Sequence, residues 1–85
     1  MRVLIPSALY SYTGGAWVEA QGETVAAVLD DLERQFPGIR FRMVDEQGRP
    51  RRHIRLFSGR EMVSDLATRL PPDGELLIVQ ALSGG

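Results

Sequence analysis

The sequence predicts a single α+β domain in which one main helix packs across a mixed β-sheet. Two observations predict this fold. The chain contains one strongly amphipathic helical pattern, and short β-branched segments stand on both sides of that pattern. A helix with one apolar stripe must bury the stripe, and here a sheet is the available partner. The length of 85 residues leaves room for one domain with a modest core.

The first elements are predicted to form a hairpin. Residues 2–5 form a short segment with β-branched residues, and Pro6 stands at its end, where a strand tolerates proline. The Tyr-Thr-Gly-Gly sequence at residues 12–15 predicts a turn, and residues 16–20 predict a second strand. We therefore expect these two strands to pair in the antiparallel direction.

The main helix is predicted to begin after Thr24, which is a suitable N-cap residue. Its apolar residues are spaced at i, i+3, i+4, i+7 and i+11, which places them on one helical face. They are Val25, Val28, Leu29, Leu32 and Phe36. The charged residues at positions 30, 31, 33 and 34 fall mostly on the other side, and Pro37-Gly38 ends the helix.

The middle of the chain is less regular. Residues 39–44 are ambiguous, because Ile39, Phe41 and Met43 alternate with two arginines. Residues 45–50 predict a turn. Residues 53–57 predict a third strand, in which Ile54 and Leu56 share one face.

The last part of the chain is predicted to supply the central strand. After a turn at residues 58–59, an irregular segment is anchored by Leu66 and Leu70. The Pro-Pro-Asp-Gly sequence at residues 71–74 predicts a turn. Residues 75–81 form a nearly continuous apolar run, which suggests a central strand that is covered on one face and partly on the other.

The order of elements is β-β-α-β-(irregular)-β, and the simplest arrangement pairs the first and last strands in parallel at the centre. This is the β-grasp, or ubiquitin-like, layout. The sequence thus predicts a β-grasp domain at residues 1–81, followed by a flexible C-terminal tail at residues 82–85 that ends in two glycines.

Composition excludes several classes of protein. Ten Lys+Arg residues against eleven Asp+Glu residues give a net charge of −1, which argues against a nucleic-acid binder and a polybasic membrane anchor. The absence of cysteine excludes disulfides, thiolate zinc sites and a cysteine nucleophile. No apolar run approaches the length of a membrane span or a signal peptide. We therefore expect a soluble cytoplasmic domain. All ten basic residues are arginine, so the sequence contains no lysine.

The chain offers no catalytic constellation in its sequence. His53 is the single histidine, and Ser58 and Asp65 are not fixed around it by any motif. No metal-ligand cluster or nucleotide-binding loop is present. We expect no catalytic residue, no metal and no bound cofactor, and the chain is not predicted to be an enzyme on its own. The basic stretch at residues 49–55 is either a docking surface for an acidic protein partner or a solvated segment.

The C-terminus carries the most specific chemistry. A tail that ends in Gly84 and Gly85 can enter a narrow channel, because glycine has no Cβ atom. The reactive group is then the α-carboxylate of Gly85. A partner enzyme that uses ATP and Mg²⁺ can activate this carboxylate as a mixed anhydride with AMP, after which the acyl group accepts sulfur as a terminal thiocarboxylate. A terminus directly after the last strand favours this interpretation over a frayed end or a cloning remnant.

At this point the sequence resembles the MoaD/ThiS-like sulfur-carrier family over most of its length. The segments that carry the resemblance are residues 2–6, 12–15, 36–40, 45–49, 52–57 and 73–85. The Tyr-Thr-Gly-Gly and Pro-Gly-Ile-Arg sequences look most like the carriers of thiocarboxylate-dependent cysteine biosynthesis. The resemblance implies a β-grasp fold and adenylylation of Gly85 by a ubiquitin-activating-type adenylyltransferase. It also implies thiocarboxylation and delivery to a sulfur-accepting synthase that makes cysteine or another metabolite such as molybdopterin.

Two positions depart from the family pattern. Many relatives have proline where this chain has Gln80, and the turn that is often Val-Asn-Gly is shortened here to Ser58-Gly59. Both lie near the predicted partner surface, so they bear on the identity of the partner more than on the fold.

A partner is predicted to contact the tail and one apolar patch. Leu82, Ser83 and Gly84 would be presented to the partner together with Gly85. If Leu76 and Ile78 point inward, then Leu77 and Val79 point outward and form a docking patch with Phe57. The alternative is that the segment between Leu66 and Leu70 covers this patch.

Two other functions remain open from the sequence. The chain could be a ubiquitin-like modifier that is joined through Gly85 to lysines of other proteins. It could also be a β-grasp module that binds its partners without any covalent step.

Overall fold

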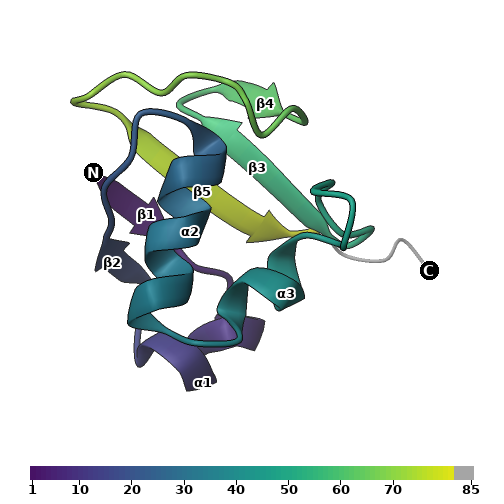
Figure 1. Cartoon of the computed structure of the whole chain (residues 1–85). Helices are drawn as coiled ribbons and strands as arrows, with labels where there is room; N and C mark the ends of the chain where they lie inside the picture. Colours follow the sequence, from purple (N-terminus) through teal and green to yellow (C-terminus); the bar gives the residue numbers. More distant parts are fainter. Residues whose placement is uncertain (82–85) are drawn as a thin grey trace.

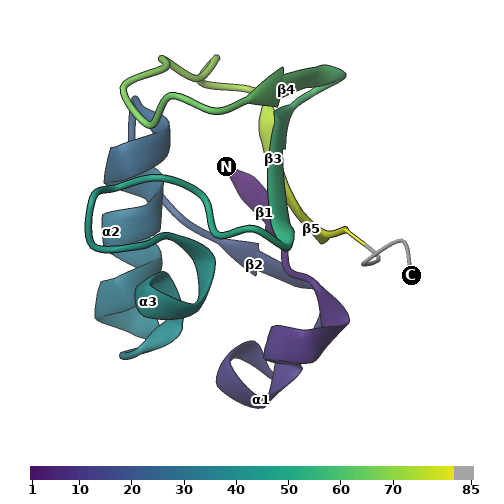
Figure 2. The ribbon, with the colours of Figure 1, turned by 90° about the vertical axis from the view of Figure 1, so that its right-hand side faces the viewer.

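A mixed sheet of five strands forms the body of the protein, with helices on one of its faces (Figures 1 and 2). The computed structural model describes residues 1–81. The elements in chain order are β1 (Arg2–Leu4), the 3₁₀ helix η1 (Ser7–Leu9), α1 (Tyr10–Thr13), β2 (Trp17–Glu19), α2 (Val25–Gln35), α3 (Ile39–Met43), β3 (Ile54–Ser58), β4 (Glu61–Val63) and β5 (Glu75–Gln80).

The first and last strands pair in parallel at the middle of the sheet. The strand order is β2-β1-β5-β3-β4, and the register sets Val3 opposite Leu76 and Leu4 opposite Leu77. The other three pairs are antiparallel. β5 therefore has a neighbour on each side, as its apolar sequence predicted. This arrangement confirms the predicted β-grasp topology.

α2 forms as the spacing of its apolar residues predicted. The Thr24 side chain accepts a hydrogen bond from the backbone amide of Ala27 at 3.1 Å, which caps the first turn. The predicted stripe from Val25 to Leu32 is fully buried, and Phe36 packs against the core with part of its surface exposed. Gly38, with φ 98°, then turns the chain into α3.

The connection between β4 and β5 lies against the N-terminal end of α2. The first amides of a helix have no carbonyl partner within the helix. Here the Val25 amide donates to the carbonyl of Thr68 at 3.0 Å, and the Ala26 amide donates to the carbonyl of Leu66 at 2.8 Å. Leu66 and Leu70 are buried, which confirms their predicted role as anchors. The connection therefore covers the same face of the sheet as α2.

The hydrophobic core lies between the helices and this covered face of the sheet. Each strand contributes the side chains that alternate with its outward residues. The fully buried large side chains are Ile5, Leu29, Leu32, Ile39, Met43, Leu56, Leu76, Ile78, Val3, Val25, Val28 and Val44.

Two predicted segments prove to be helical. The turn predicted at residues 12–15 is the end of the short helix α1, which Gly14 closes with φ 77°. The ambiguous residues 39–44 form α3, in which Ile39 and Met43 are buried while Phe41 is 61% exposed. The two buried residues are four positions apart, a spacing that stacks them on one side of a helix.

A third difference concerns the segment after β3. Residues 59–70 were predicted to be irregular, yet Glu61–Val63 form β4, which pairs antiparallel with β3. The turn at Gly59, with φ 61°, joins the two strands. The sequence gives a weak signal for β4 because the strand is short and only Val63 is buried.

The carboxylate of Glu33 closes the junction between α2 and α3. It accepts hydrogen bonds from the backbone amides of Gly38 and Arg40, each at 2.9 Å. These bonds, first that from Gly38, lower the pKa of Glu33 because they favour the ionised carboxylate.

We expect Glu33→Gln to destabilise the protein at neutral pH, and we expect this loss to shrink in acid. A carboxyl group whose pKa is lowered by folding stabilises the folded state above its unfolded pKa, near 4.5 here, and this contribution disappears as the pH falls through the folded pKa. Urea unfolding of both proteins across this range measures the effect. A difference in stability that does not change with pH would contradict it.

We expect Leu29→Ala to lower the free energy of unfolding by about 2–5 kcal/mol, because the leucine is fully buried and its removal leaves a cavity. Met62→Ala is the matched control. Its side chain is 62% exposed, so the expected change is within about 0.5 kcal/mol. Urea unfolding followed by circular dichroism measures both values, and equal values would show that α2 does not carry the core.

Candidate functional site

The C-terminal part of the chain leaves the domain from the middle strand of the sheet. In the pairing of β5 with β3, Gln80 stands opposite Ile54. The Ala81 amide then donates to the carbonyl of His53 at 2.7 Å, so the pairing extends to the last described residue. The predicted tail residues Leu82, Ser83, Gly84 and Gly85 lie outside the described residues.

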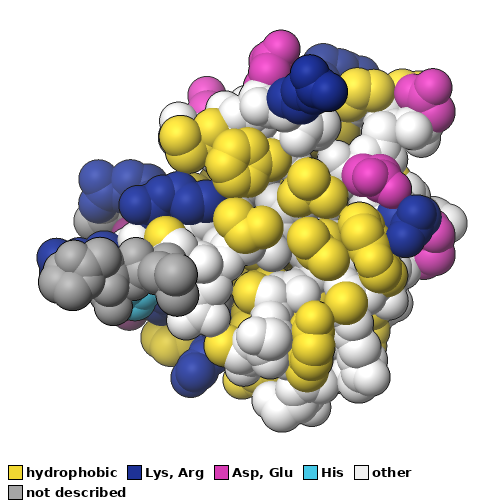
Figure 3. Space-filling view, turned by 180° about the vertical axis from the view of Figure 1, so that it is seen from behind, with side chains coloured by type: hydrophobic (Ala, Val, Ile, Leu, Met, Phe, Trp, Pro, Cys, Tyr) yellow, Lys and Arg dark blue, Asp and Glu magenta, His cyan; other side chains and the backbone are white. Residues whose placement is uncertain are grey.

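The face of the sheet that α2 does not cover presents a continuous row of apolar side chains. Figure 2 shows α2 and α3 on one side of the sheet and no described element stacked on the other. The strand registers place one apolar residue from each strand side by side on this open face. We call these residues the apolar row: Trp17, Leu4, Leu77, Phe57 and Met62. Figure 3 shows hydrophobic side chains gathered over this face.

The structure brings together the three residues that the sequence predicted as a docking patch. Phe57 and Leu77 are direct neighbours across β3 and β5, and Val79 follows on the same face of β5. All three are partly exposed. The predicted alternation is confirmed, because Leu76 and Ile78 are fully buried on the other face.

The alternative, that residues 66–70 cover the patch, is wrong. Their backbone is hydrogen-bonded to the first turn of α2, on the opposite side of the sheet. The docking role of the patch remains a prediction.

Sequence reasoning missed three members of the apolar row. Trp17 and Met62 are 42% and 62% exposed, and Leu4 is partly exposed. The exposed tryptophan within a strand was the one signal that could have drawn attention to this face. Met62 could not be placed because β4 was not predicted, and the alignment of five strands follows from their register alone.

Charged residues border the apolar row. Arg2 lies with its guanidinium 4.1 Å from the centre of the Trp17 ring and 3.2 Å from the carboxylate of Glu75. The first contact is a cation–π interaction, which holds the arginine along the edge of the row. On the other side, Arg55 stands opposite Val79. An apolar centre with a charged border is the usual composition of a protein-binding surface.

Within residues 1–81, the structure does not bring His53, Ser58 and Asp65 together into a catalytic arrangement. His53 is exposed just before β3, whereas Ser58 lies at the far end of that strand. The carboxylate of Asp65 accepts the amide of Ala67 at 2.9 Å within its own loop. Within residues 1–81, no cluster of three or more histidine or acidic side chains could hold a metal ion.

None of the helices within residues 1–81 has both the length and the apolar character that are needed to cross a membrane.

Comparison with known proteins gives a consistent result along the whole chain. A model of the ThiS family matches residues 3–85. The sulfur carrier protein CysO of Mycobacterium tuberculosis (strain ATCC 25618 / H37Rv) is 35% identical over 91 residues, which cover 100% of this chain and 98% of that protein.

Solved structures agree with the sequence comparison. A chain of the Amycolatopsis orientalis BexX/CysO complex superposes with a TM-score of 0.89 at 34% identity, covering 99% of this chain and 98% of that chain. SAMP1 from Haloferax volcanii superposes with a TM-score of 0.76 at 25% identity, covering 100% of this chain and 98% of that chain.

Proposed function

The chain belongs to the ThiS family, and on that basis we propose that it is a sulfur carrier protein whose C-terminal Gly85 carboxylate is adenylylated and then converted to a thiocarboxylate. The observation that carries the proposal is the extent of the family match, which runs to residue 85 and so includes Gly84 and Gly85. The full-length similarity to CysO supports cysteine biosynthesis as the pathway that receives the sulfur.

The chemistry follows from the properties of a terminal carboxylate. A carboxylate oxygen of Gly85 attacks the α-phosphorus of ATP, and pyrophosphate leaves, so the terminus becomes an acyl adenylate. Hydrosulfide (HS⁻) then attacks the acyl carbon, AMP leaves, and loss of the proton from sulfur gives the thiocarboxylate. Because a thiocarboxylic acid is more acidic than a thiol, the terminal sulfur is ionised and nucleophilic near neutral pH. The carrier thereby delivers sulfur without releasing sulfide.

Catalysis in this proposal belongs to the partners. A ubiquitin-activating-type adenylyltransferase binds ATP and Mg²⁺, and a sulfur-accepting synthase uses the thiocarboxylate. The carrier supplies the terminus and the surface that positions it, and it needs no bound cofactor. We propose the cytoplasm as the site of the reaction, because ATP is available there.

The open face of the sheet is the proposed docking surface for these partners. Its apolar row includes Phe57 and Leu77, with Val79 beside them, and it crosses β5, the strand that precedes the tail. Burial of such a row removes apolar surface from water and so favours association. A partner seated on this face is also adjacent to the end of β5.

We expect deletion of Gly85, or Gly84→Leu, to abolish adenylylation and sulfur transfer while leaving the fold unchanged. The deletion shortens the terminus by one residue, and the leucine adds a side chain where only a backbone can enter the channel. Intact-protein mass spectrometry after incubation with the activating enzyme, ATP and a sulfur donor measures the exchange of oxygen for sulfur.

Gly15→Ala is the matched glycine control for this experiment, because an added Cβ there meets no atom within 4 Å. The control should acquire sulfur as the wild type does. Equal sulfur transfer by the tail variants would refute the assignment of Gly85. Covalent adducts on other proteins would instead indicate the modifier function, and an unchanged wild-type mass would indicate a binding module.

We expect Phe57→Ala and Leu77→Ala each to weaken binding of the activating enzyme by about fivefold or more, because the few residues that dominate an interface lie near its centre and each cost more than about 1 kcal/mol when truncated. Tyr10→Ala is the control, because Tyr10 is 39% exposed but lies on α1, away from the row. Isothermal titration calorimetry gives the dissociation constants. If all three variants bind like the wild type, the open face is not the docking surface.

A further inference from the structure

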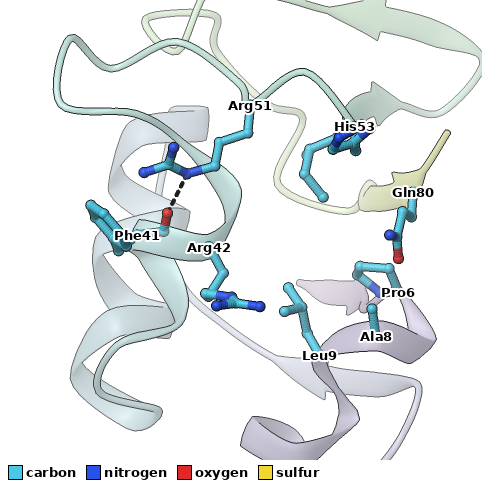
Figure 4. A pocket seen from close by; sticks show the side chains of 9 residues that line it. Pro6, Ala8, Leu9, Phe41, Arg42, Arg51, His53 and Gln80 are labelled. Atoms are coloured by element: carbon cyan, nitrogen blue, oxygen red, sulfur yellow. Dashed lines mark hydrogen bonds between the residues drawn. The ribbon is translucent and has the colours of Figure 1, made fainter. Parts of the chain in front are cut away.

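A second surface feature lies at the end of β5, around the place where the described chain ends. It is a cavity of about 330 Å³ (Figure 4). Its floor is apolar and includes Pro6, Leu9 and Ile54. We call this cavity the exit pocket.

The rim of the exit pocket is basic. Arg42 of α3, together with Arg51 and His53 from the segment before β3, lines the pocket, and Gln80 of β5 completes the rim. Figure 4 shows the Arg42 guanidinium reaching toward Leu9, with His53 and Gln80 on the other side of the cavity. No acidic side chain is among the residues that line it.

The arginines of this region are not engaged by the acidic groups of residues 1–81. Within that part of the chain, ion pairs occupy Arg2, Arg34, Arg40, Arg49 and Arg69. Neither Arg42 nor Arg51 forms one, and neither do the nearby Arg52 and Arg55. The basic stretch predicted at residues 49–55 is thus divided: Arg49 pairs with Asp45 of its own loop, whereas Arg51 and His53 line the exit pocket.

Arg51 is held in place before any ligand arrives. Its guanidinium lies 4.4 Å from the centre of the Phe41 ring, and its Nε donates to the Phe41 carbonyl at 2.5 Å. A guanidinium that is already positioned loses less conformational freedom when it binds a carboxylate. Phe41 itself is 61% exposed on the same rim, so an apolar group that enters the pocket would contact an aromatic ring as well.

We propose that the exit pocket binds an acidic segment of the activating enzyme, with a carboxylate at the basic rim to which Arg42, Arg51 and His53 belong and a neighbouring apolar side chain on the floor. This inference rests on the proposed sulfur-carrier function, because it assigns a second contact to the enzyme that receives the tail. A protein segment fits better than a nucleic acid, since the floor is apolar and the whole chain has a net charge of −1.

The position of the pocket gives this contact a physical purpose. The terminal carboxylate of the chain is negatively charged and by itself would repel an acidic partner surface. The basic rim of the exit pocket, beside the end of β5, attracts such a surface. Complementary charge of this kind mainly raises the association rate and fixes the orientation of the complex. The apolar row would then supply buried area, and the exit pocket would set the direction from which the terminus approaches.

The test compares charge reversals at two exposed arginines. Arg42→Glu changes the exit pocket, and Arg60→Glu makes the same change of charge at the opposite end of β3, where Arg60 also forms no ion pair with residues 1–81. At about 50 mM salt we expect Arg42→Glu to raise the dissociation constant for the activating enzyme by at least about tenfold, and Arg60→Glu to change it by less than about twofold. At about 300 mM salt the difference should shrink. Arg42→Gln should give an intermediate loss.

The outcomes separate this inference from the proposed function. Circular dichroism confirms that each variant is folded, and mass spectrometry shows whether the wild type acquires sulfur. If the wild type acquires no sulfur, the proposed function fails. If it does acquire sulfur but Arg42→Glu and Arg60→Glu bind equally well, the exit pocket is not a docking site.

Inorganic phosphate provides a further check on the identity of the ligand. In a titration of the whole chain followed by NMR, saturation of the pocket amides by phosphate with no effect on enzyme binding would overturn the proposal in favour of a small-anion site. Competition between phosphate and the enzyme would support it.

Discussion

The burial of one apolar stripe of α2 against one face of the sheet organises the rest of this molecule. The stripe of α2 covers the core on one face of the sheet, and α2 makes no contact with the opposite face. Because the first amides of α2 donate to carbonyls of the connection between β4 and β5, that connection is also drawn to the covered side. Within residues 1–81, the elements that shield the sheet therefore lie on one side, and the apolar row is on the other.

The six residues of β5 contribute both to the hydrophobic core and to the proposed docking surface. Its buried side chains, Leu76 and Ile78, belong to the core, and the intervening Leu77 and Val79 face outward. Its position between β1 and β3 ties the root of the tail to both halves of the sheet. The residues just before the proposed tail thus belong to a strand that is paired on both sides.

The two proposed contact surfaces differ in their physical character and so in what each can contribute. The apolar row offers area that association removes from water, which favours affinity. The exit pocket offers charge, which acts at longer range and selects an orientation. Neither surface involves the fully buried residues of the core, so interface and folding can vary independently. Under the proposed function, this separation would let the carrier bind two partners in turn without a change in its core.

Local periodicity was sufficient to predict α2 with its Thr24 cap and the alternation of β5, because these depend on residues that are near one another in sequence. The parallel pair of β1 and β5 joins residues at opposite ends of the chain, and it was predicted from the order of the elements instead. The proposed chemistry of Gly85 also rests on sequence, since it concerns a terminal group and its neighbours. The helix α3 was ambiguous because three alternating apolar residues fit both a strand and a helix, and only the shared burial of Ile39 and Met43 distinguishes them. The apolar row and the exit pocket were decided by tertiary structure alone. The row depends on the register of five strands. The pocket forms only where α3 and the segment before β3 meet at the end of β5. Neither arrangement can be inferred from a short stretch of sequence, because each brings together residues that are distant along the chain.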